Sequence, residues 1–137
     1  MNIHGEEVRV LRRRSVEFLE EAKMALKRDF FDITCFLAEQ SLQLYLKSIL
    51  LEVIGDYPRT HSVRRLLGEL CRVLESRELD EFIRVNRVRL SVLEDAYFMA
   101  RYFVKEYSKE DAEDMIKLVE ETMNIINKLI RGKNLAN

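Results

Sequence analysis

The segment FLAEQSLQLYLKSIL, residues 36–50, decides the fold of this 137-residue chain. It contains no glycine or proline, and its apolar side chains fall on every side of a helix rather than on one stripe. The apolar pattern extends over residues 30–54 and stops at Gly55, with Pro58 three residues later, as is typical of a helix C-terminus. A helix that is apolar all round is usually enclosed by neighbours. We therefore expect residues 30–54 to form a central helix.

Amphipathic patterns on both sides of this segment predict further helices. Apolar residues recur at helical spacing, with charged residues on the opposite faces, over residues 8–27, 62–75 and 109–131. The chain has one proline and four glycines, too few for the many turns of an all-β fold. We expect an all-α, up-and-down bundle of about five helices, forming a single domain over residues 1–137 with its core at 8–131.

Residues 79–106 predict either one long helix or two shorter ones. Arg84, Arg87 and Arg89 interrupt the apolar pattern of the first half, and no glycine or proline marks a break. The second half is a regular amphipathic stripe. Both alternatives remain open from the sequence.

Several residues predict where helices begin and end. Thr60 or Ser62 can cap the helix at 62–75, and Ser108 with Asp111 resembles a capping box. Gly132 is the expected C-cap of the last helix, and residues 133–137 are expected to be frayed. Gly68 lies inside a predicted helix, where glycine costs stability, and it suggests a close helix crossing.

The charge balance argues against a protein that binds nucleic acid or membranes through its overall charge. The chain has 23 basic and 24 acidic residues. No uncharged apolar run approaches the roughly 18 residues of a membrane span, and the N-terminus has no signal-peptide pattern, so we expect a cytoplasmic protein. Cys35 and Cys71 lie in apolar helical runs, which indicates buried free thiols rather than a metal or redox motif.

A row of polar residues crosses the otherwise apolar central helix. Glu39, Gln43 and Lys47 are four residues apart and therefore share one face, while Gln40 lies on another face where an apolar residue would be expected. Buried polar side chains need hydrogen-bond partners. The row can be a hydrogen-bonded network in the core, a polar seam against a second subunit, or part of a functional site.

Four residues outside the central helix could contact a ligand. His61, in a predicted turn, can act as an acid, a base or a phosphate contact, or simply cap the turn. Tyr97 and Arg101 are one helical turn apart, next to Tyr102. An arginine among apolar neighbours needs an anion, which can be Glu94, Glu39 or a bound phosphate. The sequence has no glycine-rich phosphate loop and no histidine or cysteine cluster, so we expect neither a cofactor nor a metal site.

Five segments together resemble the HEPN (higher eukaryotes and prokaryotes nucleotide-binding) family, in its prokaryotic stand-alone form. They are residues 18–22, 29–32, 36–50, 58–63 and 100–102. The resemblance implies a helical bundle that commonly forms homodimers and often accompanies a small nucleotidyltransferase in toxin–antitoxin pairs. Many family members are metal-independent endoribonucleases. In these, an arginine that holds phosphate and a histidine that assists the RNA 2′-hydroxyl are separated by four to six residues near the dimer cleft.

The sequence departs from this family at the arginine–histidine motif. The positions five to seven residues after Arg101 are Glu106, Tyr107 and Ser108, and those five to seven residues before His61 are Asp56, Gly55 and Ile54. The strict motif is therefore absent, and only Arg101 carries over, as a candidate phosphate contact.

Three functions follow from these observations, and the missing motif favours a protein that is not an enzyme. The first is a nucleotide-binding or partner-binding component that acts with a small nucleotidyltransferase in a toxin–antitoxin-type pair. The second is a divergent metal-independent endoribonuclease toxin that uses Arg101, Tyr102 and His61. The third is a structural dimerisation module whose polar row only sets the register of the dimer. A homodimer, a nucleotide or RNA are the expected partners, and a membrane is not.

Overall fold

The structure is a computed structural model that describes residues 4–133 as helices and connections, with no strand in that range. The helices are α1 (Gly5–Lys27), α2 (Phe31–Ile54), α3 (Val63–Leu74), α4 (Arg77–Val85), α5 (Arg87–Tyr102) and α6 (Lys109–Lys133). The prediction of an all-α bundle is confirmed. Six helices are present in this range rather than about five, because residues 79–106 hold the two shorter helices α4 and α5.

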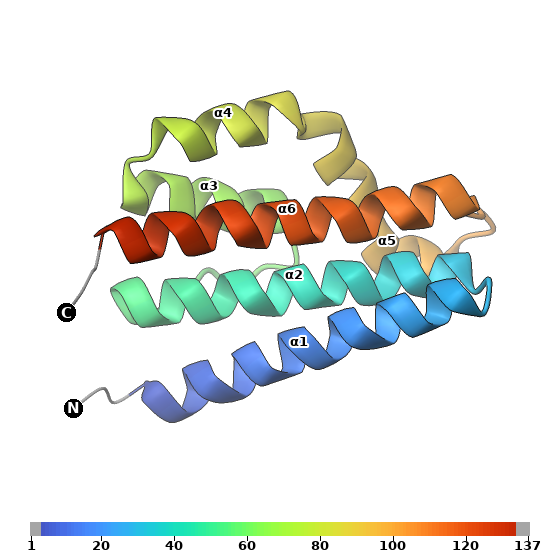
Figure 1. Ribbon diagram of the computed structural model, residues 1–137, viewed down its shortest axis with the longest axis horizontal. Helices are drawn as coiled ribbons and strands as arrows, with labels where there is room; N and C mark the ends of the chain where they lie inside the picture. The colour runs from blue at the N-terminus through green and yellow to red at the C-terminus, as the bar shows by residue number, and fades with distance from the viewer. Residues whose placement is uncertain (1–3, 134–137) are drawn as a thin grey trace.

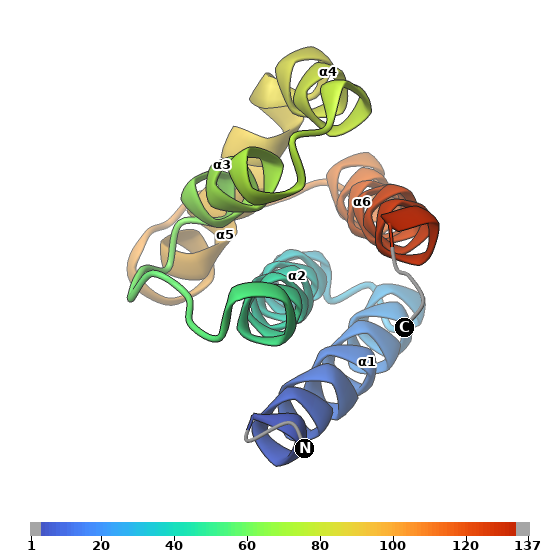
Figure 2. The ribbon, with the colours of Figure 1, turned by 90° about the vertical axis from the view of Figure 1, so that its left-hand side faces the viewer.

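Helix α2 lies at the centre, as its sequence predicts. It packs against α1, α3, α5 and α6, and the end-on view in Figure 2 shows it enclosed by them. Leu42, Leu46 and Leu50 on this helix are completely buried. A helix with neighbours on several sides must be apolar on several sides, which explains why α2 lacks the single stripe of its neighbours. Of its polar row, Glu39 and Gln43 are buried, whereas Gln40 and Lys47 are half-buried.

Helix direction follows from the short connections (Figure 1). Helices α1 and α2 are antiparallel and joined by a turn at residues 28–30. Helices α3 and α4 form a second, shorter antiparallel pair, and α5 returns the chain to the end of the bundle where α2 begins. Helix α6 then runs beside α2. The N-terminal end of α2 consequently lies beside the C-terminal end of α5.

The helix ends largely confirm the predicted caps. Ser62 caps α3 by accepting a hydrogen bond from the Arg65 N–H at 3.1 Å, and Ser108 and Asp111 bond each other's backbone N–H groups. Gly55 ends α2 with φ 81°, a left-handed conformation that glycine adopts without steric cost. The prediction that Gly132 caps α6 is wrong, because the helix continues to Lys133. The frayed end expected at 133–137 lies almost entirely outside the described residues.

Gly68 does not mark a close helix crossing. It is exposed on α3, and a Cβ atom added there would meet nothing within 4 Å. The prediction was wrong because a glycine in a helix permits a close approach but does not require one.

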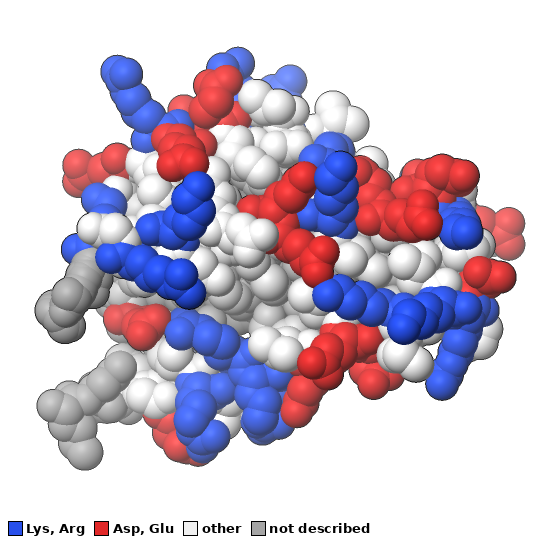
Figure 3. Space-filling model, viewed as in Figure 1, with Lys and Arg blue, Asp and Glu red and all other residues white. Residues whose placement is uncertain are grey.

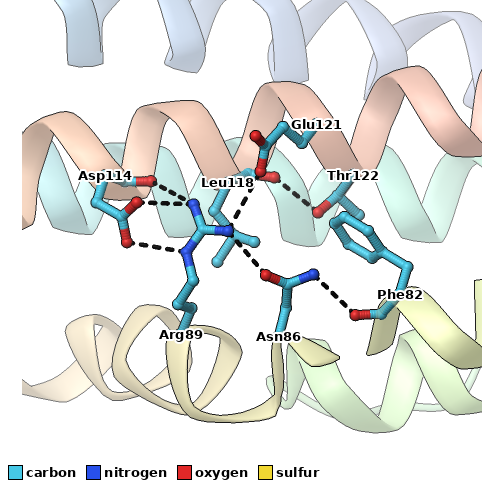
Figure 4. Close-up of polar contacts among 7 residues, drawn as sticks. All are labelled: Phe82, Asn86, Arg89, Asp114, Leu118, Glu121 and Thr122. Atoms are coloured by element: carbon cyan, nitrogen blue, oxygen red, sulfur yellow. Dashed lines mark hydrogen bonds and ion pairs between the residues drawn. The ribbon is translucent and has the colours of Figure 1, made fainter. Parts of the chain in front are cut away.

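Asn86 separates α4 from α5 in the absence of any glycine or proline (Figure 4). Its side-chain amide donates to the Phe82 carbonyl at 2.9 Å, and its side-chain oxygen accepts a hydrogen bond from Arg89 at 2.8 Å. Arg89 also forms a bidentate pair with Asp114 of α6, at 2.9 and 2.7 Å, and contacts Glu121. Arg89, one of the three arginines that interrupt the apolar pattern, thus links α5 to α6.

Helix α5 ends at Tyr102, earlier than the predicted residue 106. Phe103 has an extended backbone, and the chain then returns to the bundle, where the Tyr107 N–H donates to Asp32 of α2 at 2.7 Å. Tyr107 is buried, whereas Phe103 and Val104 are 59% and 95% exposed. The short connection therefore leaves apolar side chains on the surface beside the end of α5.

Surface charges of both signs are intermixed on the face shown in Figure 3. Several are neighbouring pairs on one helix, such as Arg13 with Glu17 and Arg9 with Glu6. This face therefore has no extended area of one sign of charge. No helix of the described part is long and apolar enough to cross a membrane.

Candidate functional site

The polar row of α2 begins at Glu39, whose side chain is completely buried. Gln40 and Gln43 each donate an amide N–H to the Glu39 carboxylate, at 2.8 Å in both cases. These contacts place Gln40, which the sequence assigned to another face of the helix, in the same hydrogen-bonded group. A buried carboxylate needs such donors because it has lost its hydration.

The environment of Glu39 favours the protonated acid. Burial, with a smaller contribution from Glu94 on α5, raises the pKa of Glu39 to about 7, even though the Gln43 and Gln40 hydrogen bonds and nearby Lys47 act to lower it. Burial also acts to raise the pKa of Glu94, but hydrogen bonds from Arg64 and Ser62 outweigh it and hold that pKa below its ordinary value. The two carboxyl groups therefore differ in charge near neutral pH, with Glu94 ionised and Glu39 close to its midpoint.

Gln43 connects the buried acid to the surface. Its side-chain oxygen accepts a hydrogen bond from Lys47 Nζ at 3.0 Å and lies 3.4 Å from Nδ1 of His61. Because an amide oxygen can only accept, the second contact is a hydrogen bond when Nδ1 carries the proton. Burial lowers the pKa of Lys47, and Glu39 partly offsets that effect. His61 thus joins the polar row, although it lies outside the helix.

His61 and Tyr97 face each other across the gap between the α2–α3 connection and α5. Their rings are stacked with centroids 4.5 Å apart, and the Tyr97 hydroxyl lies 3.3 Å from His61 Nε2. Tyr97 also contacts the ring of Phe98 edge-on at 4.9 Å. Both nitrogens of the imidazole therefore have a polar neighbour, while the residue remains exposed.

Arg101 lies on aromatic rings and not on a carboxylate. Its guanidinium carbon is 4.6 Å from the ring centre of Tyr97, 4.8 Å from that of Tyr102 and 5.4 Å from that of Phe36. Within residues 4–133 it forms no ion pair, and Nε donates to the Tyr97 carbonyl at 3.2 Å. This position confirms that Tyr97 and Arg101 share one face.

The expectation that Glu94 or Glu39 neutralises Arg101 is wrong. Glu94 accepts hydrogen bonds from Ser62 at 2.8 Å and from Arg64 at 3.0 to 3.2 Å. Glu39 is occupied by the two glutamine amides. Both acids already accept hydrogen bonds from donors other than Arg101, so the positive charge of Arg101 is left available at the surface.

A second group of cations and aromatic rings extends the site beyond Lys47. Tyr57 carries the guanidinium of Arg59 at 4.7 Å and the ammonium of Lys47 at 5.5 Å from its ring centre. Sequence reasoning missed Tyr57 and Arg59. The available signal was a tyrosine and an arginine on either side of Pro58, shortly before His61.

These contacts form a continuous surface that we name the cation–tyrosine strip. Its members are Arg59, Tyr57, Lys47, His61, Tyr97, Arg101 and Tyr102. Glu39, Gln40 and Gln43 lie beneath it. The structure therefore brings together all eight residues that the sequence singled out as candidates. They come from α2, the 55–62 connection and α5.

Two groups of arginines that lie close together in the sequence, at residues 12–14 and 84–89, do not contribute to the strip. Arg12 contacts Glu52 and Ser48, and Arg13 pairs with Glu17. Arg84 pairs with Glu81 of its own helix, and Arg89 lies at the α5–α6 contact. These arginines belong to solvated helix faces or to packing.

A hollow of about 420 Å³ lies near the end of α5 and has a different character. It is lined by Asp29, Phe30, Phe31, Asp32, Ile33, Ala100, Glu106 and Tyr107. None of these is a member of the strip, and the hollow offers carboxylates where a phosphate needs donors. Among residues 4–133, no group of three or more histidine, cysteine or acidic side chains is placed to hold a metal ion.

The strip offers two kinds of contact to a ligand. Guanidinium and ammonium groups bind phosphate oxygens, and exposed aromatic rings stack on bases for about 1–3 kcal/mol per base. The rings of Tyr57 and Tyr97 already contact cations or His61, so the rings most open to a base are Tyr102, 66% exposed, and Phe98 beside the strip, 48% exposed. The alternation of cations and rings suits a ligand in which phosphates and aromatic bases alternate.

Fold and site together define an all-α bundle with a buried polar network beneath a cationic, aromatic surface strip. The family model for the HEPN domain matches residues 8–129, which is nearly the whole chain. The chain belongs to the HEPN family, as the segments at 36–50 and 58–63 indicate.

Two solved structures share the fold. The structure of TT1696 from Thermus thermophilus aligns with a TM-score of 0.75 and 21% sequence identity, covering 95% of this chain and 100% of the other. That of ST0689, an archaeal HEPN homologue, aligns with a TM-score of 0.66 and 22% identity, covering 88% of this chain and 95% of the other. No curated protein matches the chain.

Proposed function

We propose that this HEPN protein is a nucleotide-binding component whose cation–tyrosine strip holds phosphate groups and bases. The observation that carries the proposal is Arg101, which lies on the rings of Tyr97, Tyr102 and Phe36 and has no carboxylate partner in the described part of the chain. An arginine held by rings keeps its N–H donors in one plane and available to an anion. Phosphate is the anion that this geometry suits best.

The extent of the strip supports a ligand longer than one phosphate group. Arg59 and Lys47 lie on Tyr57, and Arg101 lies on Tyr97, with His61 between the two groups. A nucleoside triphosphate or a short single-stranded RNA segment can contact both groups at once. Phosphates and bases alternate along single-stranded RNA, whereas a nucleoside triphosphate carries one base at the end of its phosphate chain. The length dependence of the affinity separates the two ligands.

The test is calorimetric titration of the purified protein with ATP, UTP and an oligouridylate of eight nucleotides. We expect binding that weakens at high salt, because it depends on phosphate contacts. Arg101→Ala should weaken it about 10- to 100-fold, which corresponds to the roughly 1.5–3 kcal/mol of a charged hydrogen-bonded contact. The matched control is Arg87→Ala, an exposed arginine at the opposite end of α5. Absence of binding, or equal losses in both variants, contradicts the proposal.

The proposal includes a small nucleotidyltransferase as a protein partner, in a toxin–antitoxin-type pair, and a homodimer. Phe98, Tyr102, Phe103 and Val104 are between 48% and 95% exposed beside the strip, which supports a surface that another chain covers. Sedimentation of the purified protein tests the homodimer. Co-purification with a nucleotidyltransferase encoded next to it tests the pair. A protein that sediments as a monomer contradicts the homodimer, and the absence of a co-purified nucleotidyltransferase contradicts the pair.

A second candidate function is RNA cleavage without a metal ion. It is favoured by the position of His61, an exposed imidazole between Gln43 and Tyr97 and adjacent to the arginine-bearing face of α5. There, His61 would take the proton of a 2′-hydroxyl while Arg101 holds the phosphate. Incubation of total RNA with the protein in a metal chelator tests it. Cleavage that disappears in both His61→Ala and Arg101→Ala supports the activity, and intact RNA at high protein concentration contradicts it.

A further inference from the structure

Glu39 is a buried carboxyl group without an ion-pair partner among the described residues. Its two oxygens accept one hydrogen bond each from Gln40 and Gln43, and it is completely inaccessible to solvent. An apolar residue would fill the same position in a helix enclosed on several sides at lower cost. The carboxyl group is hydrogen-bonded to the amide N–H of Gln43, and the amide oxygen of Gln43 contacts Lys47 and His61.

The side-chain amide of Gln43 has an N–H donor at one end and an oxygen acceptor at the other. The ionisation state of Glu39 determines which of the two ends faces Glu39 and which faces Lys47 and His61. When Glu39 is ionised, it accepts the Gln43 N–H, so the Gln43 oxygen points to Lys47 and His61. When Glu39 is protonated, one of its oxygens becomes a donor and no longer requires that N–H. The amide is then free to turn, and Lys47 loses the acceptor that holds it against the helix.

We propose that Glu39 is a positioning residue of the cation–tyrosine strip, which acts through Gln43 to set the affinity of Lys47 and His61 for a phosphodiester ligand. This inference rests on the proposed nucleotide-binding function. Protonation of Glu39 removes a negative charge from beneath the strip and releases the Lys47 ammonium toward the ligand. Both changes favour binding of an anion, so ligand binding takes up a proton.

The environment of Glu39 places its change of protonation near neutral pH. Burial, with Glu94 adding to it, raises the pKa of Glu39 to about 7. In the described part of the chain, the charged groups that act on Glu39 are Lys47 on α2 and Glu94 on α5, and Glu94 is itself paired with Arg64 of α3. Of the charged and titratable groups in the 55–62 connection, His61 contacts Gln43, whereas Arg59 pairs with Asp56 and lies over the ring of Tyr57. The nearby contact between α1 and α2 is the uncharged pair Ser15 and Ser41.

The experiment measures the affinity for an oligouridylate that carries only phosphodiesters, so that the ligand itself does not titrate between pH 6 and 8.5. For the wild-type protein we expect binding about five- to tenfold weaker at pH 8.5 than at pH 6, within the usual range of coupling between two sites. In Glu39→Gln, which mimics the uncharged acid, the affinity at pH 8.5 should stay near the wild-type value at pH 6. His61→Asn should keep the pH dependence, because its cause is Glu39.

A second measurement needs no variant. The carbon-13 shift of the Glu39 carboxyl in the wild-type protein should report a pKa that rises when the oligouridylate is added. An unchanged Glu39 titration, or the same pH profile in wild type and Glu39→Gln, overturns the positioning role while leaving ligand binding intact. Absence of binding by the wild-type protein at every pH overturns the proposed function instead.

Discussion

The imidazole of His61 is stacked on the ring of Tyr97, with centroids 4.5 Å apart, and Nε2 lies 3.3 Å from the Tyr97 hydroxyl. This contact joins the 55–62 connection to α5. Because Tyr97 also carries Arg101, the orientation of the histidine and that of the arginine depend on the same ring. The proposed acid–base group and the proposed phosphate contact are therefore positioned by one side chain.

Arg101→Ala should leave the stability of the fold nearly unchanged. Arg101 is exposed, and an exposed cation–π contact contributes about 0.5–1 kcal/mol. Urea denaturation of the variant should therefore give an unfolding free energy within about 1 kcal/mol of wild type, together with the loss of ligand binding described above. A purely structural dimerisation module predicts the reverse, with lower stability and no change in binding.

Glu39→Gln should change how stability depends on pH. Burial raises the pKa of Glu39 from an ordinary 4.5 to about 7, so the fold favours the protonated acid. The contribution of this group is fully present below pH 4.5 and is lost as the pH rises through about 7. Relative to the variant, the wild-type protein should lose on the order of 3 kcal/mol over that interval. Urea denaturation at intervals between pH 4.5 and 8.5 measures it, and parallel pH profiles contradict it.

Arg89→Ala should destabilise the bundle by about 1–3 kcal/mol, because it removes the bidentate pair with Asp114 and leaves that acid near Glu121 without a cation. Arg84→Ala is the control. Arg84 pairs with Glu81 on the exposed face of α4, and its substitution should cost no more than about 0.5 kcal/mol. Thermal unfolding of both variants gives the comparison. Equal losses would show that the α5–α6 contact does not depend on the arginine.

Gly68→Ala should stabilise the protein by about 0.5–1 kcal/mol, because the position is an exposed helix interior with free space for a methyl group. Gly55→Ala should have the opposite effect, costing about 1 kcal/mol or more, because φ at Gly55 is 81°. Denaturant midpoints of the two variants should move in opposite directions. A lower midpoint for Gly68→Ala contradicts the prediction.

The sequence predicts the helices well because each has a pattern of its own. The end of α2 at Gly55 and the cap of α3 at Ser62 follow from local chemistry. The break at Asn86 does not, because it is stabilised by Arg89 and through it by α6. Similarly, α5 stops at Tyr102 because Asp32 of α2 fixes the following connection. A helix boundary that is stabilised by residues far away in the sequence cannot be predicted from the local sequence pattern.

The same distinction applies to the candidate site. Spacing alone placed Glu39, Gln43 and Lys47 on one face, and Tyr97 with Arg101 on another. Spacing could not show that the two faces meet at His61, nor that Tyr57 carries Lys47 and Arg59. The partner of Glu94 was missed for the same reason, because Arg64 and Ser62 reach it from another helix.

The assembly of the strip from α2, the 55–62 connection and α5 has a consequence for the newly made chain. During synthesis, α1 and α2 emerge first and can close as a local hairpin with little loss of chain entropy. At that stage Lys47 is in place on α2, but α5, which carries Tyr97 and Arg101, has not yet emerged. The strip exists only after α5 has packed on α2, so a polypeptide that stops before α5 lacks Tyr97, Arg101 and Tyr102 and should bind the proposed ligand more weakly. Full affinity for that ligand would therefore require completed synthesis and folding.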